Sequence, residues 1–155
     1  MKTNAARILD RAGIAYGIRT YDFDESDLSA TTAAKKLGLP VESVFKTLVA
    51  QNDRREIVLA CIPADTELDL KALASTSGGK NADLVPIPDL QKLTGYLRGG
   101  CSPLGTKKPY RLFIDEMCQL HGTISISAGL RGVQITIAPA DLIAVANAVV
   151  ADISR

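Results

Sequence analysis

Residues 94–109, TGYLRGGCSPLGTKKP, combine four glycines, two prolines, two lysines and a cysteine in sixteen positions. Gly99 and Gly100 tolerate backbone angles and close approaches that a side chain would forbid, so this loop can align successive N–H groups on one concave surface. Such a surface binds an anion or a developing oxyanion. The alternative is that the glycine pair and Pro103 only form a turn.

Basic residues follow this loop directly. The segment TKKPYR brings Lys107, Lys108 and Arg111 close together, as a contact with a phosphate backbone requires. These three residues are therefore candidate phosphate contacts. A solvated basic face explains the same pattern.

Lys46 lies in the apolar segment VFKTLVA, which has the composition of a strand. Strand alternation puts its side chain on the same face as Leu48 and Ala50, so its ammonium group needs water or a partner. The side chain either reaches water at a sheet edge or lines a pocket, where it could hold a phosphate, carboxylate or carbonyl oxygen.

The sequence gives only weak indications of a catalytic nucleophile or of a metal site. Cys101 would need a base and an orienting partner, and the only histidine, His121, lies in a separate segment. The three cysteines lack CxxC spacing, so we expect neither a disulfide framework nor a metal site, and no motif indicates a cofactor. Tyr21, Ser127 and Gly129, taken singly, favour structural roles.

The elements that must position these residues follow from apolar spacing. Helices are predicted over 4–12, 29–38 and 68–79 and from Asp141 onward, and a helical turn is predicted over 88–95. Asn4 is the predicted cap of the first helix, and Val149 is predicted to pack inward on the last helix. Strands are predicted over 14–23, 44–50, 57–63, 82–88, 110–115, 122–128 and 133–138. Most connections have hairpin length, which favours an α+β fold: a mixed, largely antiparallel sheet surrounded by helices, in a single domain over 1–155.

Composition limits the partners. Hydrophobic residues make up 46% of the chain and the formal net charge is +1, so any contact with nucleic acid must be local. The longest apolar run, from Leu142, is about half the length of a membrane span, and the first residues lack a signal-peptide pattern. We expect a soluble, cytoplasmic protein without a membrane partner.

Three motifs together identify a family resemblance: VFKTLV at 44–49, TGYLRGGCSPLGTKK at 94–108 and ISISAGLRG at 124–132. They resemble the YbaK family of Cys-tRNA(Pro) deacylases, relatives of the editing domain of bacterial prolyl-tRNA synthetases. The resemblance covers nearly the whole chain. It implies a barrel-like mixed sheet and hydrolysis of the ester in misacylated Cys-tRNA(Pro), because a single pocket separates cysteine poorly from proline.

The resemblance also implies roles for particular residues. Lys46 matches the family's pocket lysine, and Gly99 and Gly100 match its glycine pair, so these three residues are the predicted catalytic groups. The predicted substrate-binding residues are Tyr21, Thr47, Ser127 and Gly129. Backbone donors would stabilise the oxyanion while the substrate's own thiol attacks its carbonyl, and prolyl-tRNA synthetase is the implied partner.

Two departures from the family pattern leave the specificity open. Gln134 stands where some members have an acidic residue, and Leu28 and Ser29 stand where some have a phenylalanine. Ala-tRNA(Pro), or another small misacylated amino acid, is therefore the alternative substrate. A non-catalytic module that binds a tRNA end through the same lysines is the alternative from a different class.

Overall fold

The computed structural model describes residues 2–155, which form five α-helices, two 3₁₀ helices and eight strands. The helices are α1 (Asn4–Arg11), α2 (Ala30–Leu37), η1 (Val41–Ser43), α3 (Leu70–Ser77), α4 (Ile87–Thr94), η2 (Glu116–Leu120) and α5 (Pro139–Ala146). The strands are β1 (Gly17–Thr20), β2 (Phe45–Asn52), β3 (Ile57–Pro63), β4 (Ala82–Leu84), β5 (Arg111–Asp115), β6 (Ile124–Ser127), β7 (Val133–Ile137) and β8 (Val149–Ala151).

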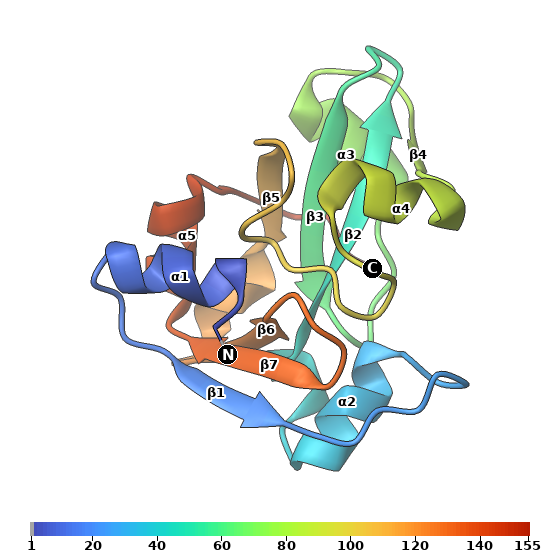
Figure 1. The fold of residues 1–155 in the computed structure, drawn as a ribbon. Coiled ribbons are helices and arrows are strands. Elements are labelled where there is room, and N and C mark those ends of the chain that lie inside the picture. Colours follow the sequence, from blue (N-terminus) through green and yellow to red (C-terminus); the bar gives the residue numbers. More distant parts are fainter. Residues whose placement is uncertain (1) are drawn as a thin grey trace.

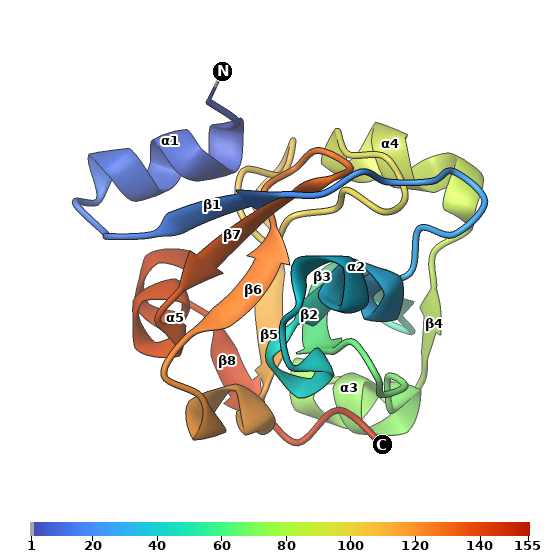
Figure 2. The ribbon, with the colours of Figure 1, turned by 90° about the horizontal axis from the view of Figure 1, so that it is seen from below.

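The larger sheet has five strands in the order β4-β2-β3-β5-β8, of which Figure 1 labels the first four and Figure 2 labels β8. Strands β2 and β3 form the predicted hairpin, with Phe45 opposite Pro63, and β4 pairs antiparallel with the outer edge of β2. Strands β5 and β8 join in parallel on the other side. Helix α3 packs Leu73 on one face of this sheet, beside Phe113 and Ile153.

The smaller sheet has the order β1-β7-β6 and is antiparallel throughout. An isolated bridge between Val44 and Ser125 links the two sheets, and Figure 2 shows them side by side. They share one core, in which Phe45 and Leu112 of the larger sheet and Ile126 of the smaller sheet are buried. Helices α1 and α5 contribute to the same core.

These observations confirm the α+β class, the hairpin and the predicted helices, with corrections. The strands in residues 2–155 form two sheets rather than a closed barrel, and Thr3, not Asn4, caps α1. The C-terminal helix ends at Ala146 because Asn147 adopts a left-handed conformation with φ 50°. Val149 is therefore not packed inward on a helix; it begins β8 and is 40% exposed.

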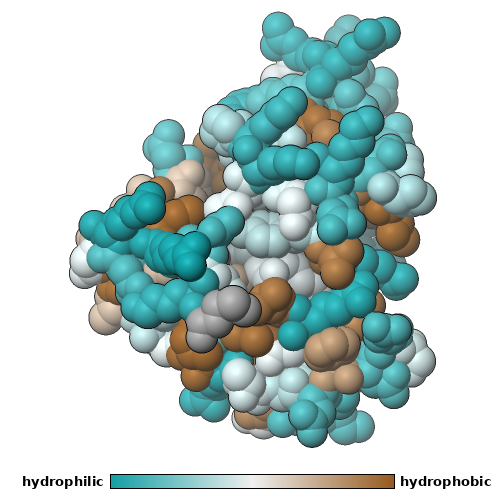
Figure 3. Space-filling view, in the orientation of Figure 1, coloured by the Kyte–Doolittle hydropathy of each residue, from teal (hydrophilic) through white to brown (hydrophobic). Residues whose placement is uncertain are grey.

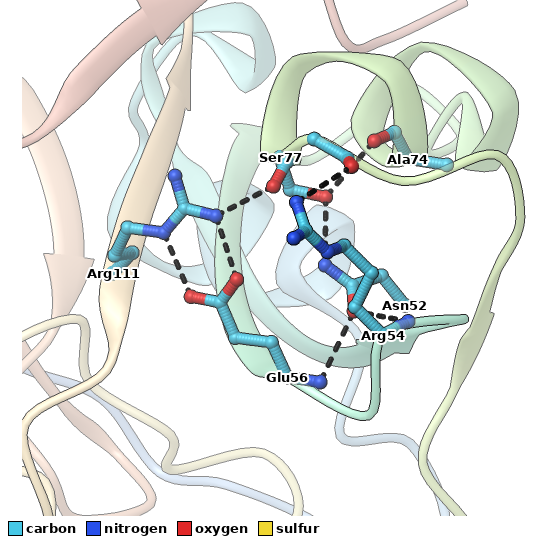
Figure 4. A network of polar contacts seen from close by, with 7 residues as sticks. Asn52, Arg54, Glu56, Ala74, Ser77 and Arg111 are labelled. Atoms are coloured by element: carbon cyan, nitrogen blue, oxygen red, sulfur yellow. Dashed lines mark hydrogen bonds and ion pairs between the residues drawn. The ribbon is translucent and has the colours of Figure 1, made fainter.

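Polar contacts fasten the tip of the β2–β3 hairpin to the end of α3 (Figure 4). The buried amide of Asn52 donates to Ser77 Oγ at 3.1 Å, and the Asn52 side-chain oxygen accepts the N–H groups of Arg54 and Glu56. Arg111 pairs through two nitrogens with the carboxylate of Glu56 and also donates to the carbonyl of Ser77. The network joins three segments that are far apart in the sequence.

A buried carboxylate holds the segment after β8. Asp115, with 0% exposure, accepts the N–H groups of Met117, Ile153 and Ser154. Arg155 and Glu67 exchange two backbone hydrogen bonds beside it. Within residues 2–155, no helix has the length and apolarity that a membrane crossing requires.

Candidate active site

A cavity of about 420 Å³ opens between α2, β2, β4, α4 and the ends of β6 and β7. This volume lies in the range of small-molecule sites. Five residues predicted from the sequence line it: Tyr21, Lys46, Thr47, Gly99 and Ser127. They come from four separate parts of the chain, so the fold brings them together.

Lys46 is half-buried on β2, and its Nζ donates to the carbonyl oxygen of Ala64 at 3.1 Å. Burial lowers the pKa of this ammonium below its ordinary value of 10.5, and the charges of Asp65 and Glu67 partly offset the shift. One backbone acceptor leaves two of the three ammonium hydrogens for a ligand. Lys46 is thus a pocket cation and does not extend freely into water.

Thr47 follows Lys46 on β2 and lies opposite Cys61 in the β2–β3 register. Its Oγ1 is buried and has no hydrogen bond of regular geometry among residues 2–155. The hydroxyl does interact with the Cys61 thiol, because it lowers the pKa of that thiol, in opposition to burial. A ligand that forms a regular hydrogen bond with the Thr47 hydroxyl would therefore be stabilised by at most about 1–3 kcal/mol. This property fits the predicted role of Thr47 in substrate binding.

Tyr96 fastens the glycine-rich loop that forms one wall. Its buried hydroxyl donates to the carbonyl of Leu104 at 2.6 Å, and burial raises its pKa to about 12. Gly129 allows the close approach of the ring, because a Cβ there would lie 2.8 Å from Tyr96 Cε1. Gly129 supports this wall from behind and does not line the cavity.

Gly99 and Gly100 have different surroundings. Gly99 lines the cavity with φ +84°, and a Cβ there would lie 2.9 Å from Leu28 Cβ. Gly100 lies outside the lining, where a Cβ would lie 3.0 Å from the backbone nitrogen of Arg131. Gly100 therefore lets the loop pack directly against the β6–β7 turn, and Gly99 lets it approach Leu28.

The loop offers fewer free donors than its sequence indicates. The N–H of Gly100 already donates to the carbonyl of Leu97 at 2.9 Å. Among residues 2–155, the N–H groups of Gly99 and Cys101 have no such acceptor, and both residues line the cavity. Gly99 and Cys101 are therefore the better-placed backbone donors, and an oxyanion contact from Gly100 stays a prediction.

Ser127 and Gln134 supply polar groups from β6 and β7. Ser127 Oγ accepts the N–H of Gly129 at 3.1 Å, which leaves its own hydrogen for donation. The side-chain oxygen of Gln134 accepts from Ser125 Oγ at 2.7 Å. Tyr21 completes this side of the cavity, and burial raises the pKa of its phenol.

The predicted phosphate contacts lie elsewhere. Lys107 and Lys108 are exposed and do not line the cavity. The guanidinium of Arg111 is held by Glu56 and Ser77 and lies 5.1 Å from the centre of the Phe113 ring. A phosphate contact from these residues stays a prediction, and Arg111 would have to exchange its partners to make one.

Cys101 lines the cavity, but burial raises the pKa of its thiol to about 11, so it is protonated near neutral pH. His121 follows η2 and does not line the cavity, so it is not placed as a base for Cys101. These placements agree with the weak sequence signal for a nucleophile. Residues 2–155 contain no cluster of three or more histidine, cysteine, aspartate or glutamate side chains suited to a metal.

Several lining residues had no sequence signal. Arg98 contributes a second cation, and Asp27 contributes a carboxylate whose pKa the hydroxyls of Thr32 and Ser29 hold at about 2. Leu84 and Ile87 line the opposite side. Arg98 is the exception among them, because a basic residue directly before Gly99 and Gly100 is visible in the sequence.

Comparison with known proteins identifies the substrate class of similar proteins. A family model described as the aminoacyl-tRNA editing domain matches residues 25–145. The chain is 40% identical over 153 residues to an Enterococcus faecalis protein named as a Cys-tRNA(Pro)/Cys-tRNA(Cys) deacylase, EbsC, covering 99% of this chain and 93% of that protein. It is 29% identical over 100 residues to the multifunctional Ser/Thr-tRNA deacylase ProXp-y of Escherichia coli K12, covering 64% of this chain and 60% of that protein.

The fold has a counterpart among solved structures. A crystal structure described as a trans-editing enzyme for prolyl-tRNA synthetase superposes with a TM-score of 0.84 and 23% sequence identity, covering 100% of this chain and 99% of that chain. At this identity the similarity concerns the fold alone.

Proposed function

Because the chain belongs to the aminoacyl-tRNA editing domain family, we propose that it is a trans-editing deacylase that cleaves the aminoacyl ester of Cys-tRNA(Pro). One observation supports this activity above all: Lys46, Gly99 and Ser127, from segments far apart in the sequence, line the same cavity. They surround it with a cation, backbone donors and a hydroxyl. An ester whose carbonyl oxygen becomes negative during cleavage needs these groups.

In the proposed reaction, the cysteinyl sulfur attacks the carbonyl carbon of its own ester. The C–S bond forms, the C–O bond to the ribose breaks, and the thiol proton ends on the departing ribose hydroxyl. Cysteine leaves as a thiolactone that water then hydrolyses. The enzyme's part is to hold the thiol against the carbonyl and to stabilise the oxyanion, which requires no nucleophilic side chain.

Each group in the cavity has a proposed task. The N–H groups of Gly99 and Cys101 donate to the oxyanion, and Lys46 adds positive charge. Ser127, Thr47 and Tyr21 orient the amino-acid part. Loss of one oxyanion donor lowers the rate of other enzymes by about 10²–10³, so these donors can account for much of the acceleration.

The proposal includes a cytoplasmic location, where tRNA is charged, and prolyl-tRNA synthetase as the partner that selects tRNA(Pro). With a formal net charge of +1, the chain has little general attraction for tRNA. Selection by a partner would supply the discrimination that the chain's own charge does not.

The test is deacylation of labelled Cys-tRNA(Pro), Ala-tRNA(Pro) and a serine-charged tRNA by wild type and Lys46→Ala at one salt concentration. We expect fast release of cysteine alone by wild type, with a loss of at least about 10² in the variant. Release of alanine or serine instead would assign a sister specificity, and for serine the likeness to the Ser/Thr-tRNA deacylase ProXp-y is the supporting observation.

A binding module without catalysis is the remaining alternative. It would retain salt-dependent binding of the charged tRNA while leaving every ester intact. Release of none of the three amino acids, together with measurable binding, would replace the deacylase proposal with this one.

A further inference from the structure

The cavity has one side that the proposed chemistry does not use. This apolar end, as we call it, consists of Leu84, Val85, Ile87 and Leu90, which lie at the end of β4, in the link that follows it and in α4. Leu84 is 50% exposed and Ile87 is 60% exposed, although both line the cavity. Figure 3 shows hydrophobic side chains at the surface on the side where Figure 1 places α4.

The apolar end is held in place by the backbone. The N–H of Val85 donates to the carbonyl of Val49 at 3.0 Å, and Leu84 pairs with Ala50 across the sheet. Pro86 caps α4 and Pro88 lies in its first turn, which limits the conformations of this segment. The surface is therefore formed before any ligand arrives, and a ligand binds it without ordering a loop.

The cavity is too large for a cysteinyl group alone. A cysteinyl group has six non-hydrogen atoms, which occupy less than about 180 Å³ even at the roughly 30 Å³ that each water molecule takes in the liquid. The cavity measures about 420 Å³. The remaining space must hold either water or the next part of the substrate, which is the terminal nucleoside.

The charges around the cavity favour a phosphate-bearing ligand. Lys46 and Arg98 both line it, and the guanidinium of Arg98 has no acidic or hydrogen-bonding partner among residues 2–155. Asp27, the one carboxylate in the lining, accepts hydrogen bonds from Ser29 and Thr32 of its own segment. A nucleotide matches this distribution, since it joins an anionic phosphate to a flat, uncharged ring.

We propose that the apolar end binds the adenine ring of the 3′-terminal adenosine of the charged tRNA, with one face of the ring against Leu84 and Ile87. This inference rests on the proposed deacylase function and names the part of the substrate that fills the rest of the cavity. The ring loses contact with water on these side chains, and the ester then lies toward Lys46 and Gly99. Binding of the ring places the ester before the amino acid is recognised.

The test compares two small esters, 3′-O-cysteinyl-adenosine and the 3-O-cysteinyl ester of methyl ribofuranoside, which share the amino acid and the ribose but not the base. Wild type should cleave the adenosine ester with the higher kcat/KM. Ile87→Ser and Leu84→Ser should each lower that value roughly tenfold, mainly through KM, and leave the ester without the base unchanged. Ile87→Leu, which keeps the apolar area, should behave like wild type.

Leu120→Ser is the matched control, because Leu120 is 72% exposed and does not line the cavity. Equal kcat/KM of wild type for both esters, or no effect of either serine variant, would overturn the inference while the deacylase activity stood. An equal loss on both esters would place the amino acid at the apolar end and also overturn it. If wild type cleaved neither ester nor Cys-tRNA(Pro), the proposed function itself would fail.

Discussion

The half-buried ammonium group of Lys46 places a positive charge in the wall of the cavity. Lys46 keeps one bond to a backbone carbonyl, and its pKa is lowered by burial. Sequence alternation predicted a lysine with apolar neighbours on its strand. Alternation puts Thr47 on the opposite face, and the fold shows that it lines the same cavity, with no hydrogen bond of regular geometry to its hydroxyl within residues 2–155.

The lowered pKa of Lys46 predicts a pH dependence. A lowered pKa means that the ammonium loses its proton at a lower pH than an ordinary lysine, so catalysis that needs the cation should decline as pH rises toward 10.5. Lys46→Arg should show no such decline, because arginine stays charged. Single-turnover deacylation across this range, corrected for spontaneous ester hydrolysis, provides the measurement. Parallel profiles for the two proteins would contradict a cationic role for Lys46.

At the scale of elements, the glycine-rich loop is a fixed wall. Tyr96 donates to Leu104 within the loop and packs against Gly129 of the β6–β7 turn, so two segments share one anchor. Gly99 is the position at which this loop comes close to Leu28 on the other side. The loop therefore determines the distance between the backbone donors and the opposite wall of the cavity.

Two glycines with nearly equal φ angles allow the effect of backbone strain to be separated from the effect of a side-chain clash at the cavity wall. Gly95 has φ +83° with no contact closer than 3.9 Å for an added Cβ, whereas Gly99 has φ +84° and would meet Leu28 at 2.9 Å. Gly95→Ala should lower the free energy of unfolding by about 1–2 kcal/mol, and Gly99→Ala should lower it further, because Leu28 must also shift. Only Gly99→Ala should also lower kcat/KM, by roughly tenfold or more. Denaturant unfolding and deacylation of each variant test this; equal activity would mean that Leu28 yields without consequence.

Local patterns were sufficient for the hairpin, because alternation and a polar turn are contiguous in the sequence. They failed at Val149, because the apolar run from Leu142 continues past the helix, and the left-handed Asn147 that separates α5 from β8 has no strong signal. The parallel pairing of β3 with β5 and the position of Leu84 beside the cavity depend on contacts across the fold. The spacing of residues in the sequence predicts neither this strand pairing nor the position of Leu84.

At the scale of the whole molecule, Asp115 connects β5, η2 and the segment after β8. Asp115→Ala removes the acceptor of three backbone N–H groups in a buried place and should lower the free energy of unfolding by about 3 kcal/mol. Glu116→Ala, its exposed neighbour, should change it by less than about 0.5 kcal/mol. Urea unfolding with unchanged m-values would measure both, and equal midpoints would refute the role of Asp115.

The backbone hydrogen bonds between residues 153–155 and residues 67–69 also bear on when a newly synthesised chain becomes active. Strand β8 and the hydrogen bonds to Asp115 complete the larger sheet, whereas the last residue in the sequence that lines the cavity is Gln134. A ribosome adding about 5–20 residues per second makes the last lining residue, Gln134, roughly 1–4 s before it makes residues 153–155. All the lining residues are therefore synthesised before the larger sheet can be completed by β8 and by the hydrogen bonds to Asp115. We expect deacylase activity to begin only after these residues have been synthesised.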